Sequence, residues 1–341
     1  MYSIVSSSSV RLALRSSSLR SLSTANLNDP ASSPNPQSIL TDQIQLPNVE
    51  RLNSFKERQL GIPGLISNPT LNDLWFHQLS TKLLDFKDYI SQSTHNDYSD
   101  CFTINNDLQS NEISNKVINQ YKNLLEKMSK KFDDNDSPLF DLTASIYNLF
   151  YFFSSIKASN SNEIKKLSAN DLLTFIPNLT NNKPLDSNFI HLINKSFGSI
   201  EEFLTLFNDS ANSIKGNGYT YLVYKHIENS KVFSKLGHLS ILNVYNNGIP
   251  HTFTSKRVSN GKEFEKKKNQ LNNSNNNSFI PSMDDAEAMN NLDFTFIPLV
   301  SIGSNPSFYL RDYGVYGKKL YINNAINSID WDVVVSRIPS K

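Results

Sequence analysis

The spacing of apolar residues changes near Asn178, and this change restricts the possible folds more than any other feature. Before that point apolar residues recur at steps of three and four, which is the period of an amphipathic α-helix. After it, short runs rich in aromatic and branched residues alternate with polar turns, as is typical of β-strands. Helices followed by a small sheet with further helices predict an α+β fold.

Three long helices are predicted in the first half. The first begins near Asn68, after the turn signal Gly61-Ile62-Pro63-Gly64, and carries a one-sided apolar stripe. The stripe consists of Leu71, Trp75, Leu79, Leu83, Phe86 and Ile90. An amphipathic helix is predicted over 115–132, and residues 139–156 are apolar almost all round, so the third helix should be buried.

The second half should combine helices with three strands. Two helices are predicted over 185–197 and 200–215, the second with Ser199 as its N-cap and acidic residues in its first turn. Strands are predicted over 219–226, 238–245 and 294–302, and closing helices over 320–326 and 331–337.

The N-terminal segment has the composition of a targeting sequence. It contains Arg11, Arg15 and Arg20, many serines, and no acidic residue before Asp29. An acid-poor, Arg- and Ser-rich leader predicts a mitochondrial presequence over residues 1–25, with a disordered basic tail as the alternative.

Composition also suggests the domain limits. Residues 26–48 are rich in Pro, Ser and Asn and are predicted to be a linker. The predicted N-terminal helical domain covers 49–165, and the predicted C-terminal α/β domain covers 166–341. A polar, Asn-rich insertion is expected within the latter, over 254–291, because such a segment cannot bury a core.

Composition and motifs argue against several functional classes. Cys101 is the single cysteine, which excludes an intramolecular disulfide and a cysteine-built zinc site. The 33 basic residues against 32 acidic ones do not predict a broad nucleic-acid-binding face, and no apolar run is long enough for a membrane helix.

The chain contains no P-loop, no Gly-x-Gly-x-x-Gly and no His-Glu-x-x-His motif, and we therefore predict that it is not an enzyme. No metal-ligand spacing is found among the other histidines, which are His95, His191, His226, His238 and His251.

Several segments resemble one known family. They are, in order, Tyr147-Asn148-Leu149-Phe150-Tyr151-Phe152-Phe153, Phe197-Gly198-Ser199 with Phe203, Gly216-Asn217-Gly218-Tyr219-Thr220-Tyr221, Pro298-Leu299-Val300, Phe308-Tyr309-Leu310, and Ile329-Asp330-Trp331. In order and spacing they are similar to the iron/manganese superoxide dismutases. The resemblance implies two long N-terminal helices facing a domain with a three-stranded antiparallel sheet, with one metal between them.

The resemblance also implies that the metal ligands are lost. The family binds its metal with three histidines and one aspartate, a ligand set suited to Mn or Fe. Leu149 corresponds to one ligand histidine, Gly303 to the aspartate, and Pro306 or Ser307 to another histidine. Residues 295–310 contain no carboxylate and no imidazole that a shifted alignment could supply.

The first predicted helix contains a histidine, His77, near a ligand position of the family. Matching Phe86 to a tyrosine of the family places Gln78 at the remaining ligand position. His77 falls nearly opposite the apolar stripe, so we expect it on the surface or at an interface. Asn247 corresponds to an amide that contacts metal-bound solvent in the family. We therefore predict no metal, no cofactor and no catalytic residue.

A mitochondrial chain with this fold and no ligands resembles the dismutase-like proteins of the small subunit of the fungal mitochondrial ribosome. The resemblance implies a structural role in mitochondrial translation, in the matrix and without membrane contact. Its expected partners are other mitochondrial ribosomal proteins, above all a paralogous dismutase-like subunit in a heterodimer, with limited rRNA contact. The alternatives are a free mitochondrial pseudoenzyme or interaction module, and an active superoxide dismutase with displaced ligands.

Overall fold

The computed structural model describes residues 44–92, 98, 101–102, 110–131, 137–159, 164, 167–227, 237–252 and 294–339. The predicted presequence, residues 26–43 of the predicted linker and the whole predicted insertion lie outside these residues. Within them helices come first and a three-stranded sheet with further helices follows, which confirms the α+β prediction. In this part of the chain no helix has the length and apolar character needed to cross a membrane.

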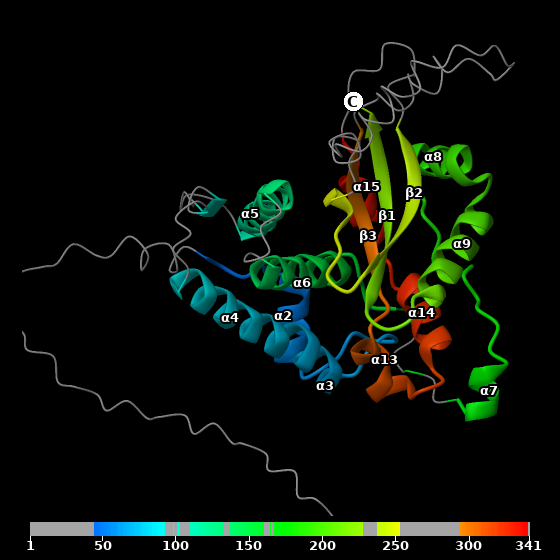
Figure 1. Cartoon of the computed structure of the whole chain (residues 1–341). Helices are drawn as coiled ribbons and strands as arrows, with labels where there is room; N and C mark the ends of the chain where they lie inside the picture. The colour runs from blue at the N-terminus through cyan, green and yellow to red at the C-terminus, as the bar shows by residue number, and fades with distance from the viewer. Residues whose placement is uncertain are drawn as a thin grey trace, which may run out of the picture.

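The first half of the molecule is helical (Figure 1). Its elements are α2 (Glu50–Glu57), α3 (Asn68–Leu71), the π-helical segment η1 (Asn72–His77), α4 (Gln78–Gln92), α5 (Ser110–Lys131) and α6 (Ser137–Ser154). Because α3, η1 and α4 follow one another without a break, they form the first long helix that the apolar stripe predicts. Helix α2 was not predicted, since Leu52 is its one fully buried residue and an eight-residue segment shows little periodicity.

Helix α6 lies at the centre of the molecule. It packs against α4 and α5 on one side and against the sheet strand β3 on the other. Residues on every side of it are buried, which confirms the expectation for 139–156.

The second half contains the sheet and its covering helices. Its elements are α7 (Ala169–Leu173), α8 (Ser187–Phe197), α9 (Ile200–Ser213), β1 (Gly218–Ile227), β2 (His238–Tyr245), the 3-10 turn η4 (Pro250–Thr252), β3 (Phe294–Gly303), α13 (Pro306–Tyr313), α14 (Lys318–Asn327) and α15 (Trp331–Ser336). The sheet is antiparallel in the order β2-β1-β3. Helices α8 and α9 contact β2, α9 also contacts β1, and α6, α14 and α15 contact β3 (Figure 1). Residues 219–224 of the central strand are all buried as a result.

Local capping explains where the helices of this half begin. The Ser199 hydroxyl accepts a hydrogen bond from the Glu202 backbone N–H at 3.0 Å, which confirms the predicted N-cap. Asp186 caps α8 in the same way through the Phe189 N–H at 2.7 Å. Gly216, two residues before β1, has φ of +84°, a conformation that favours glycine.

The end of the predicted linker is part of the fold. Ile44 is 2% exposed, and the Tyr121 hydroxyl of α5 donates to the Gln45 carbonyl at 2.8 Å. Residues 44–48 therefore pack onto the helices, so the prediction that the linker extends to residue 48 is wrong at that end. The local composition could not reveal this, because the packing partner lies more than 70 residues further along the chain.

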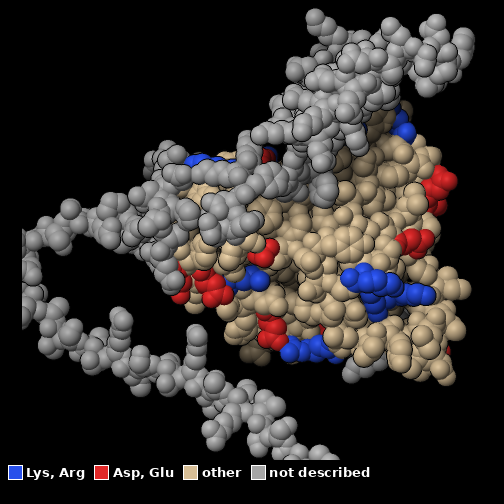
Figure 2. Space-filling model, in the orientation of Figure 1, with Lys and Arg blue, Asp and Glu red and all other residues tan. Residues whose placement is uncertain are grey.

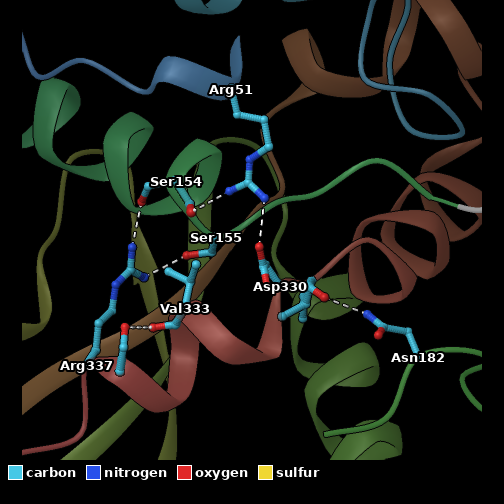
Figure 3. A network of polar contacts seen from close by, with 9 residues as sticks. Arg51, Ser154, Ser155, Asn182, Asp330, Val333 and Arg337 are labelled. Carbon is cyan, nitrogen blue, oxygen red and sulfur yellow. Dashed lines mark hydrogen bonds and ion pairs between the residues drawn. The ribbon is translucent and has the colours of Figure 1, made fainter. Parts of the chain in front are cut away.

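A polar network joins the end of α6 to the C-terminal helices (Figure 3). Ile156 and Ile329 form an isolated antiparallel bridge, and the Asp330 N–H donates to the Ser155 carbonyl at 2.8 Å. The Arg51 guanidinium of α2 forms an ion pair with Asp330 at 2.7 Å. Its second terminal nitrogen donates to the carbonyl of Ser154.

Arg337 supplies the second cation of this network. Its guanidinium donates to the hydroxyls of Ser155 at 2.7 Å and Ser154 at 2.6 Å, and lies 4.8 Å from the centre of the Tyr151 ring. The Arg337 guanidinium also donates to the Leu299 carbonyl. Leu299 has no partner on β1, because the register of β1 with β3 shifts at this point. Arg337 therefore pairs a carbonyl at this irregularity of the strand pairing.

Replacement of Arg337 should destabilise the fold strongly. We expect Arg337→Met to lower the free energy of unfolding by roughly 2–3 kcal/mol, because hydrogen bonds from a charged donor are lost and enclosed acceptors remain unpaired. The matched control is Arg311→Met, which removes an ion pair with Asp73 whose side chains are about half exposed. That change should cost less than about 1 kcal/mol. Equal losses in chemical denaturation would contradict this role of Arg337.

Candidate functional site

The segments that correspond to the family's metal ligands do converge in the structure. Trp75 from η1 contacts Phe153 of α6, with ring centroids 5.3 Å apart. Phe152 of α6 contacts Phe308 of α13 at 4.9 Å, and Tyr219 of β1 contacts Phe308 at 6.2 Å. The candidate site is therefore the meeting point of the first long helix, α6, the sheet and α13.

The ligand position on α6 is apolar and buried. Leu149 is 2% exposed, and its helix neighbours Phe152 and Phe153 are fully buried. A leucine side chain has no lone pair to donate to a metal, and its burial among apolar residues is favourable.

The position that corresponds to the aspartate has no room for a side chain. A Cβ atom on Gly303 would lie 2.8 Å from Cε2 and 2.9 Å from Cζ of Phe308, and 3.2 Å from Cε1 of Tyr219. The backbone of Gly303 is held as well, because the Tyr321 hydroxyl donates to its carbonyl at 2.9 Å. The Phe308 ring therefore occupies the space into which an aspartate at this position would extend.

Phe308 is the hub of an aromatic cluster. The cluster consists of Trp75, Phe152, Phe153, Tyr219, Phe308 and Tyr321. Phe308 contacts four of the other rings, at centroid distances of 4.9 Å for Phe152, 6.1 Å for Phe153, 6.2 Å for Tyr219 and 6.2 Å for Tyr321. Such edge and stacked contacts add to the hydrophobic stabilisation of buried rings.

The structure corrects the ligand position predicted on the first helix. Gln78 is exposed, whereas Leu74 and Trp75 are the buried residues of the preceding segment η1. The match of Phe86 to a family tyrosine therefore misplaces the ligand position. The predicted apolar stripe itself faces the interior, since Leu71, Trp75 and Leu79 are buried. His77 is exposed, in agreement with its predicted surface position.

Phe86 also has a different setting from the one that the alignment implied. It is fully buried between Phe102 and Tyr121, with ring centroids at 5.8 Å and 5.9 Å. It therefore belongs to the contact between α4 and α5, and it cannot serve as a guide to the ligand position.

The second histidine position is likewise not in the interior. Ser307 is exposed and Pro306 is half-buried, whereas Phe308 is 1% exposed. Pro306 is the first residue of α13, and the orientation of this short helix was not predicted. Its first fully buried side chain is the Phe308 ring at the hub of the aromatic cluster.

The turn after β2 contacts α6 through its backbone. Asn148 donates from Nδ2 to the Gly248 carbonyl at 3.1 Å and accepts from the Tyr221 hydroxyl at 2.6 Å. Asn247, the residue predicted to correspond to the family's amide, is half-buried in this turn. The amide that links helix, strand and turn is thus that of Asn148.

A buried histidine, which sequence reasoning did not single out, lies beside this network. The Tyr147 hydroxyl and Nε2 of His251 share a hydrogen bond of 2.6 Å, and Nδ1 of His251 is 4.0 Å from the Glu126 carboxylate. Burial, together with the charge of Lys122, lowers the pKa of His251 to about 3. Burial also raises the pKa of Tyr147 well above its ordinary value. Both groups are therefore neutral at physiological pH.

The residues at the candidate site do not fit the family's metal. Among the described residues, no group of three or more His, Cys, Asp or Glu side chains is placed to hold a metal ion. More directly, the Phe308 ring fills the space beside Gly303, and the α6 position is a leucine. A site that binds Mn or Fe needs imidazole and carboxylate donors at these points.

Comparison with known families supports the fold. Residues 185–256 match a family model described as "Iron/manganese superoxide dismutases, C-terminal domain". The matched residues comprise α8, α9, β1, β2 and η4. Together with the helical first half and the antiparallel sheet, this match shows an iron/manganese superoxide dismutase-like fold. The segment from β3 to α13, where the aspartate and a histidine would lie, falls outside the matched residues.

The packing of Phe308 against Gly303 can be tested by a double-mutant cycle. Gly303→Ala should lower the free energy of unfolding by about 1–3 kcal/mol, because the added methyl group overlaps the Phe308 ring. In a Phe308→Leu background the same change should cost at least about 1 kcal/mol less, since the smaller side chain can move away. If the two costs were equal in chemical denaturation, the ring would not occupy that space.

The buried histidine predicts a specific pH dependence. The folded-state pKa of His251 is below its unfolded value of about 6.5, so the unfolded chain binds the proton first. Neutral His251 makes its full contribution to the free energy of unfolding above pH 6.5. This contribution falls as the pH drops toward 3, by up to about 1.4 kcal/mol per pH unit. His251→Gln should weaken this dependence in denaturation experiments between about pH 7 and 4.5. The exposed His191→Gln should retain the wild-type slope, and a retained slope in His251→Gln would refute the assignment.

Proposed function

We propose that this protein is a non-catalytic structural component of the small subunit of the mitochondrial ribosome, with a dismutase-like fold that serves as a scaffold for protein contacts. The observation that carries the proposal is the Phe308 ring in the space that a side chain at Gly303 would need. With leucine at position 149 as well, the interior favours packing over metal chemistry.

The assignment to mitochondria rests on the sequence. The leader with Arg11, Arg15 and Arg20 has the composition of a mitochondrial presequence. A dismutase-like fold with apolar residues at ligand positions resembles the dismutase-like proteins of the fungal mitochondrial small subunit, which supports a role in mitochondrial translation.

The surface around α13 supports pairing with a paralogous dismutase-like subunit. Ser307 and Leu310 lie on the exposed side of this helix, and Leu310 is 44% exposed. Val315 in the following turn is 75% exposed. Exposed apolar residues near one another, as Leu310 and Val315 are in the chain, fit a protein interface.

The proposal predicts the behaviour of the chain in mitochondria. A tagged chain should be imported and should sediment with the small ribosomal subunit in a density gradient. The purified chain should contain no stoichiometric Mn or Fe and should lack dismutase activity, because the ligand positions carry no donors. Sedimentation at the size of a free protein would instead favour a separate interaction module. About one metal ion per chain with dismutase activity would favour an enzyme, and either result would overturn the proposal.

A further inference from the structure

Three lysines gather where α9 ends and α14 begins. Lys215 follows the end of α9, and Lys318 and Lys319 are the first two residues of α14. The Lys318 ammonium donates to the backbone carbonyls of Asn212 and Ile214, which holds the two helix ends together. Basic side chains form a compact group over this part of the molecule in the space-filling view (Figure 2).

Some basic residues of the described surface have acidic partners, but these lysines do not. Lys183 pairs with Glu201 and Arg311 pairs with Asp73. Within the described residues, by contrast, no ion pair involves Lys215, Lys318 or Lys319. Burial and the neighbouring charge of Lys215 lower the pKa of Lys318, as expected for cations that lie close together.

The local backbone adds to the positive potential. Helix α14 has ten residues, Gly317 at its N-cap without a side-chain hydrogen bond, and no acidic residue in its first turn. Helix α9, in contrast, has the Ser199 cap and two glutamates in its first turn. Acidic residues are favoured at the positive end of a helix, so two lysines there add to the positive potential of this surface.

Exposed tyrosines flank the lysines. Tyr316, two residues before Lys318, is 58% exposed, and Tyr245 at the end of β2 is 55% exposed. The latter is close to Lys215 in the fold, because the Asn246 N–H donates to the Asn217 carbonyl at 3.0 Å. Large exposed rings next to unpaired cations are suited to stack on bases while the ammonium groups contact phosphates.

We infer that this surface, formed by Lys215, Lys318, Lys319, Tyr245 and Tyr316 and termed the α9–α14 patch, binds an unpaired or looped segment of RNA. The inference rests on the proposed function in one respect, since the ribosome would supply the RNA. An anionic membrane is less well matched, because membrane-binding surfaces present a continuous apolar face beside their cations. The patch is small, in agreement with the near-balanced total charge of the chain.

The inference can be tested with the full chain and a fluorescein-labelled single-stranded RNA of mixed sequence, about 20 nucleotides long. Fluorescence anisotropy at several salt concentrations would compare Lys215→Gln/Lys319→Gln with the wild type. Lys318 is left in place because its hydrogen bonds join α9 to α14. We expect the double variant to bind about tenfold more weakly, and the slope of log K against log salt to fall by about 1.4. Tyr316→Ala should weaken binding about tenfold with little change in the slope.

A matched control removes the same charge elsewhere. Lys183→Gln/Lys195→Gln also lowers the net charge by two on the same half of the molecule and should bind RNA like the wild type. Equal losses in the two double variants, or no RNA binding by the wild type, would overturn the inference. A third result would also overturn the inference. If the patch variant bound RNA normally but lost binding to phosphatidylglycerol vesicles or to polyglutamate, the ligand would be a membrane or an acidic protein.

The failure of this inference and the failure of the proposed function are distinguishable. If the wild type sediments with the small subunit and the patch variant binds RNA as tightly as the wild type, the inference is wrong and the function stands. If RNA binding depends on the patch but the chain never sediments with ribosomes, the function is wrong and the patch stands. Unchanged melting temperatures of the variants would show that the binding losses are not caused by unfolding.

Discussion

Helix α6 is buried on every side, and both halves of the molecule pack around it. It contacts α4 and α5 in the first half and β3 in the second. A helix that is apolar all round can be stable in water only when it is enclosed by other elements. The N-terminal helices and the sheet therefore share one core, and neither half would cover α6 if it were alone.

Polar groups of α6 determine how it sits against the sheet. Asn148 is fully buried, and its amide accepts a hydrogen bond from Tyr221 and donates one to the Gly248 carbonyl. At the end of the helix, Ser154 and Ser155 accept hydrogen bonds from Arg337. Buried polar groups are costly when unpaired, so a rotation or shift of α6 would break several bonds at once. Apolar packing alone would permit more than one arrangement.

At the candidate site, positions that correspond to metal ligands of the family belong to the packed core. A glycine at position 303 leaves space beside β3, and the Phe308 ring fills this space from α13. The rings around Phe308 then supply the close contacts that a metal and its ligands would otherwise provide. The two positions depend on each other, because a larger residue at 303 would require a smaller one at 308.

Most helices and strands were predictable, because periodicity and turn residues are local properties of the sequence. Strand β2 has its predicted bounds, and α9 begins after its predicted cap, Ser199. The sequence by itself also determined that Leu149 and Gly303 cannot be metal ligands, since the identity of a side chain decides whether it has a donor atom. The buried side of the first long helix was predicted too, since Leu71, Trp75 and Leu79 are buried, whereas two positions matched to metal ligands were misplaced. Gln78 and Ser307 were expected at ligand positions but are exposed. Only the tertiary structure decided that the Phe308 ring lies against Gly303, because that contact depends on the orientation of α13 against β3 and on side chains distant in the sequence, which no local pattern encodes.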